Sequence, residues 1–147
     1  MYKRILVPTD GSALSAKAVD SALALAALLK AEVVALKVVP HYPQSYFEGS
    51  APVDLNAVGQ VELQWIEAAK NVVLAVKASG EAIGVKVRPE TAMSDLVSET
   101  VLATATRLEC DLIVMASHGR NGLKRLLLGS ETQQVLTHSH IPVLVLR

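Results

Sequence analysis

MASHGRNGLKRLLLGSET (Met115–Thr132) follows directly on the apolar run Cys110–Val114 near the end of the chain. The pattern predicts a buried strand that ends at Met115, a turn that carries glycines, and a helix that begins at Gly129-Ser130. The first N–H groups of a helix have no partner within it, and glycine lets a ligand approach the backbone closely. This combination is typical of a phosphate-binding turn, although glycines before helices are also common as plain turn residues.

The start of this helix carries a second local signal. Ser130 begins Ser-Glu-Thr-Gln, the pattern of a capping box in which the side chain of Gln133 reaches back to the helix start. Positive φ angles are expected at the glycines of the turn, because glycine adopts them without strain.

Composition limits the classes of protein to which the chain can belong. The 147 residues are 51% hydrophobic and carry 14 basic and 14 acidic side chains. One core and one domain over residues 1–147 are therefore expected, with no surplus charge to attract nucleic acid or an anionic membrane. Cys110 is the single cysteine, which excludes an intramolecular disulfide. With no signal-peptide pattern after Met1 and no apolar run near about eighteen residues, the sequence predicts a cytoplasmic protein.

Short apolar runs alternate with segments of helical periodicity along the whole chain. Strands are expected at Lys3–Pro8, Val33–Val39, Val85–Arg88, Cys110–Val114 and Ile141–Leu146. Helices are expected from Ser12 to Leu29, from Val58 to Ser79-Gly80, from Val97 to Leu108, and from Ser130 onward. Strands that are apolar throughout are buried on both faces. The sequence therefore predicts a doubly wound α/β domain, in which helices cover both faces of a parallel sheet.

Two of the expected strands are followed by polar turns. Pro8-Thr9-Asp10-Gly11-Ser12 leaves the first strand, and Ser117-His118-Gly119 leaves the fourth. In such sheets a ligand binds beyond the carboxyl ends of the strands, where the winding reverses. The strand order 3-2-1-4-5 makes the first and fourth strands neighbours, so it brings both turns to that point.

Four motifs resemble the universal stress protein family, in order and over essentially the whole chain: ILVPTDGS (5–12), MASHGRNG (115–122), LLLGS (126–130) and IPVLVLR (141–147). The nucleotide-binding branch of that family is marked by Gly, two residues, Gly, nine residues, then Gly-Ser or Gly-Thr. Gly119 and Gly129-Ser130 fit this pattern, whereas Ala116 occupies the position of its first glycine. The resemblance implies a protein that binds an adenine nucleotide, ATP, with any Mg²⁺ arriving on the phosphates.

The resemblance also implies roles for particular residues. Gly119, Gly129, Ser130, Glu131 and Thr132 would hold the phosphates and ribose, Asp10 would lie at the ribose and adenine, and Pro8, Thr9, Val38 and Met115 would wall the base. Arg120 is a looser phosphate contact, Ala116 takes the first glycine position, and His118 is either a ligand contact or an ordinary loop residue. Thr-Asp-Gly-Ser is by itself an ordinary turn, so the role of Asp10 depends on its meeting the fourth strand.

Two departures from the motif have expected consequences. The methyl group of Ala116 is expected to crowd the ligand at a cost of about 1–3 kcal/mol, so that Ala116→Gly would tighten binding. Glu131 places a carboxylate beside the phosphates. Its side chain is expected to face solvent while its backbone N–H contacts the anion, and an acidic residue in the first turn of a helix complements the helix dipole.

Other nucleotide and catalytic signatures are missing from the sequence. It has no Gly-x4-Gly-Lys-Ser/Thr loop and no Gly-x-Gly-x-x-Gly after the first strand. Asp10, His118 and Ser130 could be read as a hydrolase triad, but no Gly-x-Ser-x-Gly elbow supports it. The sequence shows no evident general base with a positioned attacking water, so it does not argue for efficient ATP hydrolysis. The histidines show no recognised metal-site spacing.

The sequence therefore predicts an ATP-binding regulatory protein of the stress response. The alternatives are a dimeric stress protein that has lost nucleotide binding and acts through partner contacts, and a slow ATPase or autophosphorylating enzyme. The segment Ile141–Leu146 would be an apolar edge strand, and it predicts a homodimer that pairs edge to edge, as the family resemblance also implies.

Overall fold

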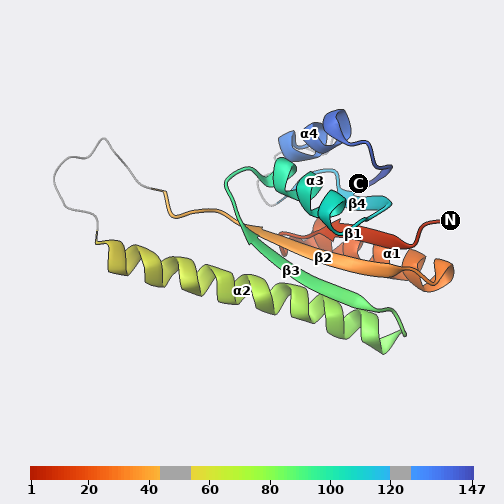
Figure 1. Cartoon of the computed structure of the whole chain (residues 1–147), viewed down its shortest axis with the longest axis horizontal. Coiled ribbons are helices and arrows are strands. Elements are labelled where there is room, and N and C mark those ends of the chain that lie inside the picture. Colours follow the sequence, from red (N-terminus) through yellow and green to blue (C-terminus); the bar gives the residue numbers. More distant parts are fainter. Residues whose placement is uncertain (44–53, 120–126) are drawn as a thin grey trace.

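The computed structural model describes residues 1–43, 54–119 and 127–147. The elements in chain order are β1 (Arg4–Pro8), α1 (Ala13–Leu29), β2 (Glu32–Val39), α2 (Leu55–Ala82), β3 (Val87–Met93), α3 (Val97–Arg107), β4 (Leu112–Ala116), α4 (Ser130–His138) and β5 (Val143–Leu146). They form a five-stranded parallel sheet of order β3-β2-β1-β4-β5, which confirms the predicted fold (Figure 1). Within the described ranges, no helix is long and apolar enough to cross a membrane.

Alternate residues of each central strand pack into two separate cores, one on each face of the sheet. Ile5 and Val7 of β1 pack with α1 and α2 on one face of the sheet, in a cluster that includes Val19. Leu6, between them, packs on the opposite face in a cluster that includes Val101 of α3. Successive side chains of a strand point to opposite faces, so a strand covered on both faces must be apolar at every position.

The reversal of winding lies between β1 and β4. Ile5 pairs with Leu112, and Leu6 pairs with Ile113. On the other side of β1, the last aligned pair is Pro8 with Leu36 of β2. The exit turns of β1 and β4 are therefore neighbours, as the predicted strand order requires.

The structure corrects three predicted boundaries around β3, namely the end of the preceding helix and both ends of the strand. The helix expected to end at Ser79-Gly80 continues to Ala82. Gly80 is buried within it, and a Cβ there would overlap Val87 Cγ2, so this glycine allows close packing and does not end the helix. The reversal is instead made by Gly84, whose φ is 77°. β3 begins at Val87 and continues well beyond the predicted end, through Pro89. Proline is tolerated there because β3 is an edge strand.

Charged side chains close the amino end of the sheet. The carboxylate of Asp111 accepts hydrogen bonds from the backbone N–H groups of Lys3, at 2.8 and 3.1 Å, and Arg4, at 3.0 Å. Glu32 accepts from the Arg4 guanidinium at 3.2 Å and from Lys86 Nζ at 2.7 Å. These contacts join β1, β2 and the segments that enter β3 and β4.

Candidate functional site

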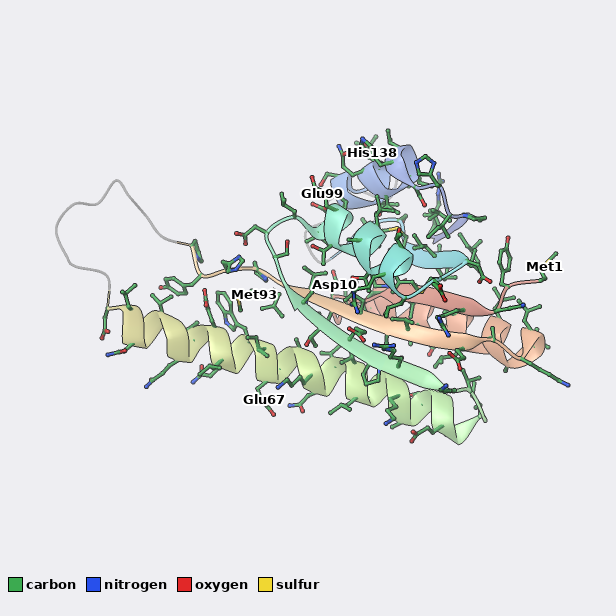
Figure 2. All side chains as sticks on the ribbon, viewed as in Figure 1. Met1, Asp10, Glu67, Met93, Glu99 and His138 are labelled. Carbon is green, nitrogen blue, oxygen red and sulfur yellow. The ribbon has the colours of Figure 1, made fainter. Side chains whose placement is uncertain are left out.

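The opposite, carboxyl end of the sheet holds a cavity of about 620 Å³. Its lining comes from the ends of β1, β2 and β4 and the amino ends of α3 and α4, and Figure 2 shows Asp10 in this region. The lining residues are Pro8, Thr9, Asp10, Ser15, Leu36, Lys37, Val38, Pro40, Val97, Met115, Ala116, His118, Gly119, Gly129, Ser130, Glu131 and Thr132. Every predicted site residue is among them except Arg120, which lies outside the described residues.

The turn after β1 fixes the carboxylate of Asp10. Its Oδ1 accepts a hydrogen bond from Ser12 N–H at 2.9 Å, and Gly11 turns the chain with a φ of 79°. Its Oδ2 faces the turn after β4, where a Cβ added to Gly119 would lie 2.6 Å away. The two exit turns therefore meet at the carboxylate of Asp10, on which its predicted role depends.

Two buried hydroxyl groups lie beneath this turn. Thr9 Oγ1 and Ser15 Oγ are 3.1 Å apart, and Ser15 Oγ also donates to the carbonyl of Ser12 at 2.9 Å. Both residues line the cavity. The buried polar groups on this wall are thus paired with one another, which keeps the turn in one conformation.

The structure corrects the expected reason for two of the glycines. Gly119 and Gly129 do not have positive φ, and the φ of Gly129 is −61°. Gly119 instead makes room for the Asp10 carboxylate. At Gly129 a Cβ would lie 3.2 Å from His118 Cα, because Gly129 N–H donates to the Ser117 carbonyl at 2.7 Å. Both positions need glycine for close packing between turns.

The predicted capping box is wrong. Gly129 is the N-cap of α4, Ser130 is already its first residue, and no side chain caps this end. The Gln133 side chain donates to the Leu128 carbonyl instead, at 3.3 Å. The backbone N–H groups of the first turn have no acceptor within the helix, so they are available to an anion in the cavity.

Thr132 and Ala116 join α4 to β4. Thr132 Oγ1 donates to the Ala116 carbonyl at 3.0 Å, and Thr132 is 2% exposed. This hydroxyl is therefore engaged in the protein, and a ligand would meet the backbone N–H of Thr132. The methyl group of Ala116 belongs to the core cluster under α1. This position argues against the expectation that the methyl crowds a ligand.

Glu131 is exposed, as expected, but its side chain also has a partner that the sequence did not suggest. Its Oε2 accepts a hydrogen bond from Ser98 N–H at 2.8 Å. Ser98 lies in the first turn of α3, whose N-cap residue Leu96 makes no side-chain capping bond. Glu131 thus caps a helix other than its own.

Backbone groups of Val38 face the cavity. The carbonyl of Leu36 accepts from Thr9 N–H at 2.9 Å, so the backbone groups of Leu36 point towards β1. Because the direction alternates along a strand, the backbone groups of Val38 point to the same side. β1 ends at Pro8, opposite Leu36. The N–H and C=O of Val38 therefore point past the end of β1, towards the cavity that Val38 lines.

Some lining residues were not predicted, namely Ser15, Leu36, Lys37, Pro40 and Val97. Lys37 could have been found from the sequence, since it is a charged residue inside the apolar run of β2. The others depend on how α1, β2 and α3 pack around the cavity, which periodicity does not reveal.

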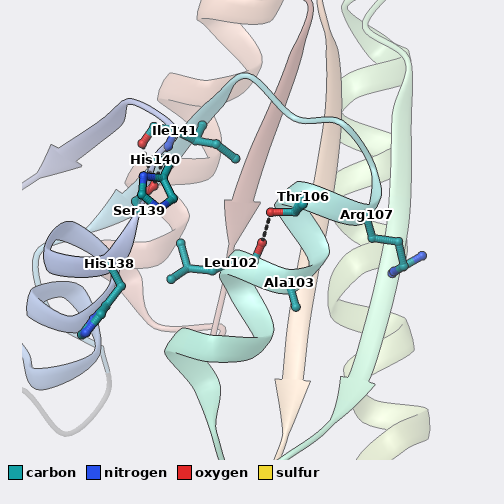
Figure 3. Close-up of a pocket in the computed structure, with 8 residues that line it drawn as sticks. All are labelled: Leu102, Ala103, Thr106, Arg107, His138, Ser139, His140 and Ile141. Carbon is teal, nitrogen blue, oxygen red and sulfur yellow. Dashed lines mark hydrogen bonds between the residues drawn. The ribbon is translucent and has the colours of Figure 1, made fainter.

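A second cavity, of about 500 Å³, lies between α3 and the segment that joins α4 to β5 (Figure 3). Thr106 Oγ1 donates to the Leu102 carbonyl, and Arg107 pairs with Glu90 at 3.3 Å. Figure 3 shows the Arg107 side chain directed away from His140. The polar groups of this cavity thus do not converge on one point.

Cys110 lies outside both cavity linings. It is 5% exposed, and burial raises the pKa of its thiol to about 11. The thiol is protonated at neutral pH, and Cys110 packs in the core cluster beneath α3 and α4. Among the described residues, no group of three or more His, Cys, Asp or Glu side chains is placed to hold a metal ion.

Comparison with known proteins decides the family. The model of the universal stress protein family matches residues 1–147. The chain belongs to this family. It is 35% identical to universal stress protein MJ0531 of Methanocaldococcus jannaschii, over 100% of this chain and 83% of that protein.

Two solved structures of similar proteins share the fold of this universal stress protein. MJ0577 of the same archaeon superposes with a TM-score of 0.83 at 32% identity, covering 99% of this chain and 96% of that one. UspA of Lactobacillus plantarum gives a TM-score of 0.86 at 25% identity, covering 99% and 98%.

Other structural neighbours were solved with adenine nucleotides. One universal stress protein is in complex with cAMP, at 24% identity and a TM-score of 0.69. Another, from Archaeoglobus fulgidus, is in complex with dAMP, at 15% identity and a TM-score of 0.69. At these identities they show the shared fold, so the ligand of this chain must be argued from its own residues.

Proposed function

We propose that this universal stress protein binds an adenine nucleotide, ATP, in the cavity at the carboxyl end of the sheet, and acts in the cytoplasm as a regulatory protein of the stress response. The observation that carries the proposal is the meeting of the two exit turns beside the uncapped amino end of α4. A volume of about 620 Å³ lies within the roughly 300–1,000 Å³ of small-molecule sites.

The amino end of α4 supplies the phosphate contacts. The N–H groups of Ser130, Glu131 and Thr132 have no acceptor in the first helical turn, and the helix dipole favours an anion there. Any Mg²⁺ would be bound mainly by the phosphates, as is usual for this ion at nucleotide sites. Asp10, held at the cavity wall, would accept hydrogen bonds from the ribose hydroxyls.

The backbone of Val38 favours adenine over guanine. Its adjacent N–H and C=O match the edge of adenine that carries the acceptor N1 and the donor N6 amino group. Guanine carries an N–H donor and a carbonyl acceptor at the same atoms, so both contacts would be mismatched. Leu36, Met115 and Val97 supply apolar surface for the base.

No residue is assigned a catalytic role. The hydroxyl of Thr132 donates to Ala116, and the carboxylate of Asp10 is assigned to the ribose hydroxyls, so neither is left to activate a water. Positioning of an attacking water requires a base within hydrogen-bond reach of it. We therefore propose a nucleotide-dependent regulator, not an enzyme that turns ATP over.

Calorimetric titration with ATP and GTP tests the proposal. We expect binding of ATP in the micromolar range and binding of GTP at least about tenfold weaker, because two mismatched hydrogen bonds cost about 1–3 kcal/mol each. Mass spectrometry of small molecules released from the purified protein should find an adenine nucleotide. A protein that releases none and binds neither nucleotide would favour the alternative of a dimer acting through partner contacts. Steady phosphate release would favour a slow ATPase.

We also propose a homodimer that forms edge to edge at β5, over Ile141 to Leu146. β5 is an edge strand, and Leu144 is 41% exposed. Val145 is a poor position for a test, because it packs against the core beneath α3 and α4 and a charge there would disturb the fold. Leu144→Lys places the charge on the exposed edge instead.

Light scattering of this variant tests the interface. Leu144→Lys should shift the protein towards monomer, whereas the control Leu28→Lys, at a leucine of α1 that is 83% exposed, should leave the dimer intact. A wild type that is monomeric at high concentration would refute the dimer.

A further inference from the structure

Glu131 lies where the amino ends of two helices meet at the cavity. It belongs to the first turn of α4, lines the cavity beside Ser130 and Thr132, and accepts a hydrogen bond from Ser98 of α3 at 2.8 Å. That bond holds the carboxylate at the rim, because the side chain must break it to turn away. A fixed negative charge therefore stands next to the helix end that would bind phosphate.

The helix ends around the cavity differ in how they are capped. Ser12 Oγ accepts from Ser15 N–H at the start of α1, and Glu131 caps α3. The start of α4 has no side-chain cap. Oxygen atoms of the chain thus already accept hydrogen bonds from the amino ends of α1 and α3, and the amino end of α4 remains for a ligand.

We propose that Glu131 sets the preference of this site for the number of phosphates on the nucleotide. The inference rests on the proposed function, since it concerns the same cavity. Each added phosphate brings more negative charge near the fixed carboxylate, so Glu131 lowers the affinity for ATP more than for ADP, and for ADP more than for AMP. Adenosine, which has no charge, is unaffected.

The charges that line the cavity support this role. Among the described lining residues, Lys37 is positive, whereas Asp10 and Glu131 are negative. Lys37 and Asp10 lie on β2 and after β1, on the side of the cavity where the base and ribose would bind. Glu131 is the acidic residue on the α4 side, and its charge therefore acts mainly on the phosphates.

Glu131→Gln separates the charge from the hydrogen bond. Glutamine keeps a side-chain oxygen that can accept from Ser98 N–H, so the connection between α3 and α4 remains. The matched control is Glu99→Gln, which removes a charge from the first turn of α3 (Figure 2) at a residue that is not among those lining the cavity. Glu131→Ala removes both the charge and the acceptor. Its melting temperature measures how much the hydrogen bond from Ser98 N–H contributes to stability.

The experiment is calorimetric titration of adenosine, AMP, ADP and ATP without Mg²⁺ into wild type, Glu131→Gln and Glu99→Gln. We expect Glu131→Gln to bind ATP about three- to tenfold tighter, with smaller gains for ADP and AMP and none for adenosine. The gain should shrink when the salt is raised from about 0.05 M to about 0.5 M, because an exposed charge is screened. Glu99→Gln should change each affinity by less than about twofold.

The outcomes distinguish this inference from the proposed function. An equal gain for adenosine and ATP, or no gain for ATP, overturns the role of Glu131 and leaves nucleotide binding intact. Weaker binding of Mg²⁺-ATP by Glu131→Gln, with free ATP unchanged, also overturns it, because the carboxylate would then be a ligand of the metal ion. If none of the three proteins binds any of the four compounds, the proposed function itself is wrong.

Discussion

The two ends of the parallel sheet differ in whether the chain itself supplies acceptors for their N–H groups. At the amino end, carboxylates of the chain accept the hydrogen bonds: Asp111 takes the N–H groups of Lys3 and Arg4, and Glu32 takes the side chains of Arg4 and Lys86. At the carboxyl end, the first turn of α4 is left uncapped beside a cavity of about 620 Å³.

The contrast follows from the geometry of parallel strands. Because each helix runs back over the sheet, helix amino ends gather at the carboxyl ends of the strands, and their free N–H groups make that end suited to an anion. The amino end has no such requirement and can be closed for stability. Substitutions at the amino end should therefore alter stability without altering binding, and those in the cavity turns should do the reverse.

The largest effect is expected from Gly119→Ala. The new Cβ would lie 2.6 Å from Asp10 Oδ2, so the carboxylate must leave the position in which Ser12 N–H holds it. Loss of the charged hydrogen bonds proposed between Asp10 and the ribose should weaken ATP binding by about ten- to a hundredfold. The melting temperature should change little, since Gly119 is exposed.

Gly59→Ala is the matched control for this substitution. Gly59 lies in α2, and a Cβ there has no atom within 4 Å. The control should leave ATP affinity unchanged and raise stability by up to about 1 kcal/mol, because alanine favours a helix. Unchanged affinity in a folded Gly119→Ala protein would contradict the placement of Asp10 at the ligand.

The next largest effect is expected at the closed end, from Asp111→Ala. The substitution leaves the N–H groups of Lys3 and Arg4 without their carboxylate, so the free energy of unfolding should fall by about 2 kcal/mol. Denaturant titration measures this loss, and Asp111→Asn, which keeps one accepting oxygen, should lose less. ATP affinity should be unchanged in both variants. A large loss of affinity in folded Asp111→Ala would show that the two ends are not independent.

The sequence predicted the arrangement of the fold because strong local patterns specify it. Strands that are apolar at every position require cover on both faces, and this requirement predicted the parallel sheet. Its order was predicted from the two polar exit turns, which meet only if the first and fourth strands are neighbours. The boundaries of β3 were missed, since Pro89 and Glu90 interrupt the apolar pattern and are tolerated only because the strand is at an edge. Gly80 looked like a helix end, although it is a contact point between α2 and β3.

The lining of the site was predictable, but the roles of individual atoms were not. Motif spacing singled out Gly119 and Gly129, which line the cavity, whereas the reason why each is glycine depends on contacts with Asp10 and His118 across the chain. In the same way, the sequence suggested that Gln133 caps its own helix, while the cap observed nearby is made by Glu131 on α3. Such contacts between elements have no signature in local spacing.

Ala116→Gly should have a smaller effect, on stability alone. The methyl group packs in the core under α1, so its loss and the added freedom of glycine should lower the free energy of unfolding by about 1–2 kcal/mol. Calorimetry should show the same ATP affinity as wild type. Clearly tighter binding would mean that the methyl does crowd the ligand, and that the missing glycine of the motif weakens this site.

The smallest effect is expected from the charge of Glu32. The hydrogen bond from Lys86 lowers the pKa of this carboxyl below its ordinary value of 4.5, and the hydrogen bond from Arg4 and the charges of both partners act in the same direction, against the opposing effect of burial. A carboxyl group with a lowered folded-state pKa contributes stability above its unfolded pKa and loses that contribution as the pH falls through the folded value. Wild type should therefore melt slightly higher than Glu32→Gln at pH 7, and the difference should shrink as the pH falls below the ordinary value of 4.5 and disappear once the carboxyl is protonated in the folded protein. Because the side chain is 36% exposed, solvent and salt screen the interaction, and the difference should also shrink in high salt. If the two proteins differ as much at pH 3 as at pH 7, Glu32 acts through packing, and the amino end is closed by contacts other than its charges.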